Sequence, residues 1–149
     1  MHRRNMLTAA IKIVGAAIPI SLLGRRAEAD APNAAKVVYH LSDADKVDFV
    51  LGNIRNHYDG MGGPQNVTIA LVVHGPALQA FHLATAKPNV KQRTAELKTT
   101  GLHLNACANT MRGQNITLTD LLPGFMAAEK GGVVMLAELQ SQGYAYLRP

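Results

Sequence analysis

The chain has 149 residues, a formal net charge of +5 at pH 7, one cysteine and no tryptophan. That length suits one domain and little more. The positive charge gathers at the N-terminus, where residues 1–29 hold five of the 15 basic side chains but one of the ten acidic ones. The remainder is nearly balanced in charge, and it shows no basic stripe with interleaved aromatic residues. A nucleic-acid partner is therefore not predicted.

Residues 1–29 have the pattern of a signal peptide. Two arginines at positions 3 and 4 precede an apolar run over residues 6–23, and Ala27-Glu28-Ala29 supplies the small residues that a signal peptidase needs. The arginine pair resembles a twin-arginine signal, so we predict export to the periplasm by that route, followed by cleavage. The alternative is a leader retained as a membrane anchor, because the run is almost long enough to span a bilayer. No membrane span is predicted after cleavage.

Residues 30–35 are predicted to form a short linker, and residues 36–149 to form the folded domain. Strands and helices alternate along this domain. Strands are predicted over residues 36–41, 66–73, 102–106, 125–129 and 144–147. Helices are predicted over residues 42–58, 76–84, 89–98 and 132–142, with a turn or short helix over 107–113 and a helical turn that starts with a capping box at 117–120.

This alternation predicts an α/β fold, a three-layer sandwich in which a five-stranded parallel sheet carries helices on both faces. The run over residues 66–73 is apolar or β-branched almost throughout, as in a strand that is buried on both faces. We predict the flavodoxin-like strand order 2-1-3-4-5. In that order the first and third strands are neighbours, and ligands bind at their carboxyl ends.

The lone cysteine, Cys107, follows the third predicted strand and precedes the predicted turn or short helix. One cysteine cannot form an internal disulfide, so Cys107 is an inert buried thiol, a link to another chain or a reactive group. The backbone N–H groups at a helix start favour a thiolate over a thiol. The position of Cys107 at the carboxyl end of a strand therefore favours the reactive interpretation.

Four other residues are candidates for the same site. His74 ends the second strand and could accept the thiol proton, although it could equally bond the loop at Gly75. His40 precedes the first predicted helix and is a candidate for the same role as His74. Its alternative role is a contact with another subunit. Asn109 and Thr110 carry donors that could hold an anionic sulfur, but such residues are also common in turns and caps. The remaining histidines show no metal-ligand spacing, so neither a metal site nor a cofactor is predicted.

Several segments resemble the DsrE/DsrF-like family, whose proteins act in sulfur transfer and sulfur oxidation. The resemblance covers residues 36–147 and rests on the order and spacing of five segments. These are Val37-Val38-Tyr39-His40-Leu41, Val73-His74-Gly75-Pro76-Ala77-Leu78, Ala106-Cys107-Ala108-Asn109-Thr110-Met111, Leu121-Leu122-Pro123-Gly124 and Leu139-Gln140-Ser141-Gln142-Gly143-Tyr144-Ala145-Tyr146. The resemblance implies a five-stranded flavodoxin-like sheet, assembly into homo-trimers or hexamers, and a role for Cys107 as the residue that accepts sulfur as a persulfide.

We therefore predict a sulfur carrier or sulfurtransferase-like protein of the cell envelope, in which Cys107 accepts sulfane sulfur and His74 assists. The predicted partner is a sulfur donor or acceptor protein, or a small sulfur compound such as thiosulfate. The alternative is a non-enzymatic, oligomeric protein that binds a small ligand in the same pocket, with Cys107 only lining it. Reactivity of the thiol separates the two hypotheses.

Overall fold

A computed structural model describes residues 34–149, so the predicted signal peptide over residues 1–29 lies outside the described residues. Five parallel strands form one sheet: β1 (Ala35–Leu41), β2 (Val67–Val73), β3 (His103–Cys107), β4 (Phe125–Ala128) and β5 (Ala145–Leu147). Their order across the sheet is β4-β3-β2-β1-β5. The predicted α/β class and the five-stranded parallel sheet are thus confirmed.

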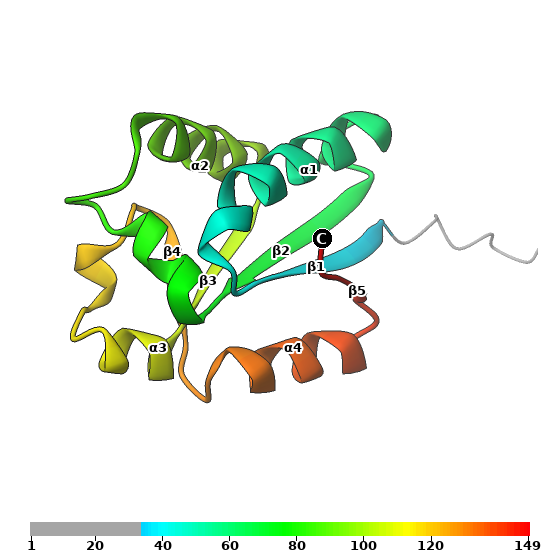
Figure 1. The fold of residues 1–149 in the computed structure, drawn as a ribbon. Helices are drawn as coiled ribbons and strands as arrows, with labels where there is room; N and C mark the ends of the chain where they lie inside the picture. The colour runs from blue at the N-terminus through cyan, green and yellow to red at the C-terminus, as the bar shows by residue number, and fades with distance from the viewer. Residues whose placement is uncertain (1–33) are drawn as a thin grey trace, which may run out of the picture. The chain divides into compact units, whose positions relative to one another are not determined.

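Helices connect the strands and cover both faces of the sheet. The α-helices are α1 (Val47–Gly60), α2 (Pro88–Thr100), α3 (Ala108–Gly113) and α4 (Gly132–Ser141). Short 3-10 helices are η1 (Ala44–Lys46), η2 (Gly75–Phe81) and η3 (Leu118–Asp120). Figure 1 shows α1 and α2 together above the sheet and α4 below it, which gives the three predicted layers. No helix within residues 34–149 is long and apolar enough to cross a membrane.

The predicted strand order, 2-1-3-4-5, is wrong. β2 lies between β1 and β3 and pairs with both of them, so β1 and β3 are not neighbours. Burial explains the difference, because every residue of β2 except Thr68 is buried, and an edge position would expose part of that run to water. The chain steps across the sheet from β1 to β4, and then returns to the far side of β1 for β5. This return carries α4 across the face opposite α1 and α2.

The two faces of the sheet bury clusters of different size. Alternate residues of each strand point to opposite faces. One face packs against α1 and α2 in a large cluster that includes Ile54, Leu71, Phe81 and Leu97, all of them at most 1% exposed. The other face packs against α4 in a cluster whose buried members are Val38, Ala70, Val72 and Leu136. The two outer layers therefore contribute unequally to the apolar core.

Local sequence rules account for several element ends. α2 begins at Pro88, whose fixed φ suits the first turn, and ends before Gly101, which adopts a φ of 117°. The predicted capping box is present, since the Thr117 N–H donates to Asp120 Oδ2 at 2.8 Å. The segment after β2 forms the 3-10 helix η2 rather than the longer helix predicted over residues 76–84. It ends early because residues 81–83 form backbone hydrogen bonds with residues 120–122.

Candidate functional site

Cys107 is both the last residue of β3 and the N-cap of α3. Its side chain points toward the face that α4 covers, because the alternating residues Leu104 and Ala106 belong to the opposite cluster. A Cβ placed on Gly132, the first residue of α4, would lie 3.2 Å from the Cys107 Cβ. The thiol thus sits at the carboxyl end of a strand and between the starts of two helices. Cys107 is only 6% exposed, so access to it is narrow.

The surroundings of the sulfur favour its ionised form. Burial raises the pKa of the Cys107 thiol, but hydrogen-bond donors outweigh burial and bring the pKa below its ordinary value of 9.0. These donors are the Gly132 N–H at the start of α4, the Thr110 hydroxyl, and the N–H groups of Thr110 and Asn109 in the first turn of α3. The side chain forms no regular capping hydrogen bond. Donors near a sulfur stabilise its anionic form more than its neutral form, which is why they lower the pKa of the thiol.

His40 and His74 meet at the ends of β1 and β2. Their Nε2 atoms are hydrogen-bonded at 2.5 Å, and their ring centroids lie 4.7 Å apart with an angle of 25° between the planes. The rings therefore meet end to end, and one of the two facing nitrogens donates a proton that the other accepts. His40 Nδ1 is bonded in turn to the Tyr146 hydroxyl of β5 at 2.6 Å. A polar row thus runs along the carboxyl ends of β5, β1 and β2.

Burial and a nearby positive charge disfavour the charged forms of both imidazoles. Burial is the largest cause that lowers the pKa of His40 and of His74 below the ordinary value of 6.5, and the Arg148 guanidinium lowers both further. The Asp43 carboxylate acts in the opposite direction without reversing the shift. Arg148 Nη2 donates to Ser42 Oγ at 3.0 Å and lies 3.4 Å from Asp43 Oδ2, which holds the C-terminal end beside β1.

The predicted site residues lie at the carboxyl ends of β1, β2 and β3 and in the first turn of α3. A Cβ on Gly132 would lie 3.4 Å from the His74 Cβ, so His74 is next to the thiol across the start of α4. His74 nevertheless bonds His40, and neither imidazole is among the groups that shift the pKa of Cys107. The Thr110 side chain is among the groups that lower the pKa of the Cys107 thiol. Asn109 provides its backbone N–H, while its side-chain oxygen accepts from Arg112.

Sequence reasoning missed three contributors to this site. Gly132 supplies an N–H group, and only the return of α4 across the sheet brings it to Cys107. Tyr146 reaches His40 because β5 pairs with β1, a neighbour relation that the predicted strand order did not contain. Gln114, the C-cap of α3, donates to the carbonyl oxygen of Gly75 at 3.1 Å. The glycine pair at the start of α4, Gly131 and Gly132, is the one local signal for a close backbone approach.

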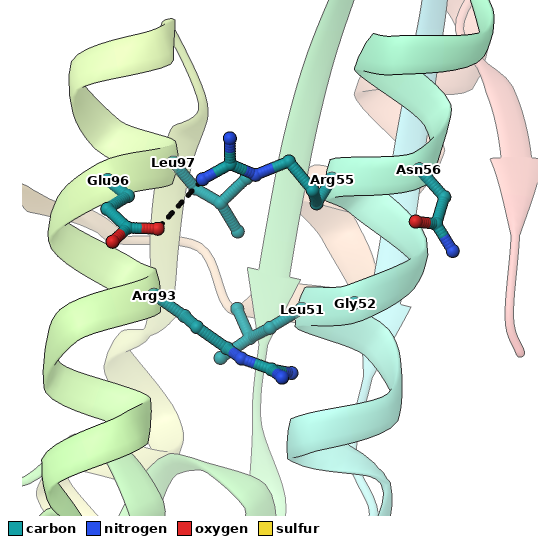
Figure 2. Close-up of a pocket in the computed structure, with 7 residues that line it drawn as sticks. All are labelled: Leu51, Gly52, Arg55, Asn56, Arg93, Glu96 and Leu97. Carbon is teal, nitrogen blue, oxygen red and sulfur yellow. Dashed lines mark hydrogen bonds and ion pairs between the residues drawn. The ribbon is translucent and has the colours of Figure 1, made fainter.

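A separate cavity of about 210 Å³ lies between α1 and α2 on the opposite face of the sheet. Figure 2 shows Arg55 reaching from α1 to Glu96 on α2, with an N–O distance of 2.8 Å, above the side chains of Leu51 and Leu97. The residues that line this cavity include neither a histidine nor the cysteine. Within the described part of the chain, no group of three or more His, Cys, Asp or Glu side chains is arranged to hold a metal ion.

Comparison with known proteins supports the family resemblance. The model of the DsrE/DsrF-like family matches residues 37–149. A similar solved structure is that of MTH1491, a protein of unknown function from Methanobacterium thermoautotrophicum. The two sequences are 26% identical and the structures superpose with a TM-score of 0.68, and the match covers 77% of this chain and 99% of that one. The ychN protein of E. coli is 16% identical with a TM-score of 0.59, covering 77% and 99% of the two chains. BT1422 from Bacteroides thetaiotaomicron is 15% identical with a TM-score of 0.57, covering 76% and 94%.

The last two structures, below 25% identity, support the fold alone, and no curated protein matches the chain. The family match is the stronger finding, because it spans every strand of the sheet and includes Cys107 and both histidines of the polar row. The chain belongs to the DsrE/DsrF-like family, which is associated with sulfur relay.

Proposed function

We propose that Cys107 accepts a sulfane sulfur atom and carries it as a persulfide. The observation that supports this proposal is the set of donors that converge on the sulfur from the starts of α3 and α4. Only a thiolate attacks a sulfur donor at a useful rate, and these donors increase the thiolate fraction at neutral pH. Three of them are backbone N–H groups, so the protein need not reorganise side chains when the charge forms.

The proposed reaction is a displacement at sulfur. With thiosulfate as donor, the Cys107 thiolate attacks the outer sulfur atom, and a new S–S bond forms at the cysteine. The S–S bond of thiosulfate breaks, and its electron pair leaves with sulfite. The product is a persulfide anion on Cys107, and no external oxidant or reductant is consumed. A persulfidated protein can replace thiosulfate, in which case its own cysteine thiolate is the leaving group.

The part of His74 in this proposal is to accept the proton of the thiol before attack. Its pKa lies below 6.5 because of burial and Arg148, so the imidazole is neutral at pH 7 and can take up a proton. His40 and Tyr146 continue from His74 to the exposed end of β5, which gives that proton a path to solvent. The thiol proton must still travel from Cys107 to His74, which requires a water molecule or a rotation of the imidazole.

Mass spectrometry of the intact protein tests the proposal. The protein is incubated with thiosulfate, and separately with a low-molecular-weight persulfide, and weighed before and after treatment with a thiol reductant. We expect wild type to gain the mass of one sulfur atom, which the reductant removes. Cys107→Ser is the matched control and should gain nothing. An unmodified wild type, or equal modification of Cys107→Ser, would remove the persulfide role.

The low exposure of Cys107 limits its contact with a sulfur donor, which leaves a second candidate function, non-enzymatic binding of a small ligand at this end of the sheet. This function predicts slow alkylation of Cys107 with an ordinary thiol pKa. It also predicts that a ligand stabilises the protein equally in wild type and in Cys107→Ala. Rapid alkylation below pH 8 would instead support the sulfur carrier.

We also propose that the protein acts in the periplasm after export through its N-terminal segment. The Ala27-Glu28-Ala29 triplet places the proposed cleavage before Asp30. N-terminal sequencing of protein from a periplasmic extract should begin near Asp30. A product that starts at Met1 and sediments with membranes would instead indicate a retained anchor.

We further propose that the protein assembles into a homo-oligomer, as the family resemblance implies. β4 and β5 are short edge strands, and each leaves one side of its backbone without a strand partner in the sheet. Light scattering across a wide concentration range should give the mass of a trimer or hexamer. A constant monomer mass would contradict this proposal.

A further inference from the structure

Gln114 lies at the centre of a series of hydrogen bonds that runs from His82 to the Thr110 hydroxyl, in the first turn of the helix that Cys107 caps. Its Nε2 donates to the carbonyl oxygen of Gly75 at 3.1 Å, and its Oε1 is bonded to His82 Nε2 at 2.9 Å. The Gly75 N–H donates to Thr110 Oγ1 at 2.9 Å. Thr110 is the third residue of α3 and Cys107 is the N-cap of that helix, and the Thr110 hydroxyl is among the groups that lower the pKa of the Cys107 thiol. α3 thus carries the thiol at its N-cap and the central amide at its C-cap.

All bonds in this series have the same direction. Because Gln114 donates through Nε2, its Oε1 must accept, so His82 carries its proton on Nε2. Because Thr110 Oγ1 accepts from Gly75, the hydroxyl proton is free to point at the sulfur. The Gly75 N–H and the Gly75 carbonyl belong to neighbouring peptide groups, so Gln114 affects Thr110 by fixing the position of the turn between them.

The hydrogen bonds to Thr110 and Gln114 both depend on the backbone conformation of Gly75. Its φ of +59° lies in the left-handed region, which glycine adopts without the cost that other residues incur. That conformation presents the Gly75 N–H to Thr110 and its carbonyl oxygen to Gln114 at the same time. A turn made of a flexible residue needs external bonds to stay in one shape, and Gln114 supplies one of them.

We propose that Gln114 is a positioning residue for Cys107, which holds the Gly75 turn so that the Thr110 hydroxyl points at the sulfur. The inference rests on the proposed function, because it concerns how the reactive form of the same thiol is maintained. Gln114 acts through Gly75 and Thr110, so its removal should change the ionisation of the thiol rather than the binding of a sulfur donor.

Alkylation of Cys107 by iodoacetamide as a function of pH measures this effect, because the thiolate is the form that reacts. Gln114→Met keeps the length of the side chain and removes both hydrogen bonds. We expect its profile to shift to higher pH by about half a unit, so that the rate constant at pH 7 falls about threefold. Gln92→Met is the control, since Gln92 is an exposed glutamine of α2 that bonds Glu96. It should match wild type.

A double-mutant cycle with Thr110→Val tests whether Gln114 acts through Thr110. We expect the effect of Gln114→Met to vanish when the Thr110 hydroxyl is already absent, and to persist in Thr110→Ser, which keeps a hydroxyl. Equal effects of Gln114→Met in the wild-type and Thr110→Val backgrounds would overturn the proposal. So would a wild-type profile in folded Gln114→Met, with folding checked by circular dichroism.

The outcomes for the two proposals are separable. A shifted alkylation profile in Gln114→Met, with no sulfur gained by wild type, would reject the persulfide function and keep the positioning role. Sulfur gain by wild type with an unshifted profile in Gln114→Met would do the reverse. If Gln114→Met does not fold, Gln114→Glu replaces it, because this variant keeps the acceptor for His82 and loses the donor to Gly75. The same shift is expected, and its absence would overturn the positioning role.

Discussion

The sheet face beneath α1 and α2 buries most of the apolar core, whereas the face beneath α4 carries Cys107, His40, His74 and the buried Asn105. On the first face, the apolar side chains of residues such as Ile54 and Leu71 are completely buried. On the second face, Asn105 Nδ2 must bond the carbonyl oxygens of Leu71 and His103, each at 3.3 Å, to be buried at all. The comparison indicates that stability and chemistry are drawn largely from opposite faces of one sheet.

A large-to-small substitution on the α1 and α2 face should give the largest loss of stability and the smallest change in the alkylation rate of Cys107. Ile54→Ala deletes a side chain that is 0% exposed, so the free energy of unfolding should fall by about 3–4 kcal/mol. Urea denaturation measures this loss. The rate constant for Cys107 alkylation under native conditions should stay within about twofold of wild type, as expected for a group across the sheet. A larger change in the folded variant would contradict the division between the faces.

The corresponding substitution under α4 should cost less stability and slow the alkylation of Cys107 more. Leu136 is the one buried side chain that α4 contributes to the smaller cluster. Leu136→Ala should lower the free energy of unfolding by about 2 kcal/mol, at the low end for such a change, because the site is near solvent. It should also slow alkylation of Cys107 several-fold, because α4 then holds the Gly132 N–H less firmly against the sulfur. Unchanged alkylation would show that α4 is fixed by other contacts.

A single methyl group at the start of α4 provides a finer comparison. A Cβ on Gly132 would meet the Cys107 Cβ at 3.2 Å, and the His74 Cβ and Val72 Cγ1 at 3.4 Å each. Gly132→Ala should therefore displace α4 slightly, lower the free energy of unfolding by about 1 kcal/mol and slow alkylation. Gly113→Ala is the control, because a Cβ there meets no atom within 4 Å. If the two variants had the same stability and the same alkylation rate, the close contact at Gly132 would not determine the position of α4.

The sequence was sufficient to predict the strands, their parallel direction and the place of Cys107, because these follow from local patterns. The period of apolar residues identified β1 and β2, and the change from apolar to small polar residues after residue 106 identified a strand end. The predicted strand order failed although the evidence against it was present. The apolar run over residues 66–73 was identified as buried on both faces, yet the predicted order placed it at an edge.

The contacts of the site could not be predicted because they depend on which strands are neighbours. Gly132 and Tyr146 reach the site from segments 25 or more residues beyond Cys107, through the return of the chain to β5. His40 and His74 were each predicted as single candidates, and only the pairing of β1 with β2 brings their rings together. Residue types thus indicated which groups have useful chemistry, while topology decided which of them touch.

The smallest predicted effect concerns pH and acts on the α4 face. The pKa values of His40 and His74 in the folded protein lie below 6.5, chiefly because burial disfavours their charged forms; the neighbouring His74 then lowers the pKa of His40, and Arg148 lowers both. The unfolded chain therefore binds protons more readily than the folded one as the pH falls below 6.5. The resulting stability is fully present above pH 6.5 and is lost as the pH falls through that value toward the folded pKa values.

Urea denaturation at pH 7.5 and 5.5 should accordingly show wild type losing stability on acidification, and His40→Gln losing less. The remaining imidazole of His74 then has no neighbouring ring with which to form a hydrogen bond, and part of the pH dependence disappears with His40. Ile54→Ala, on the other face, should keep the wild-type difference between the two pH values although its stability is lower at both. If His40→Gln kept the full wild-type difference, the pH sensitivity would have to come from groups outside the polar row.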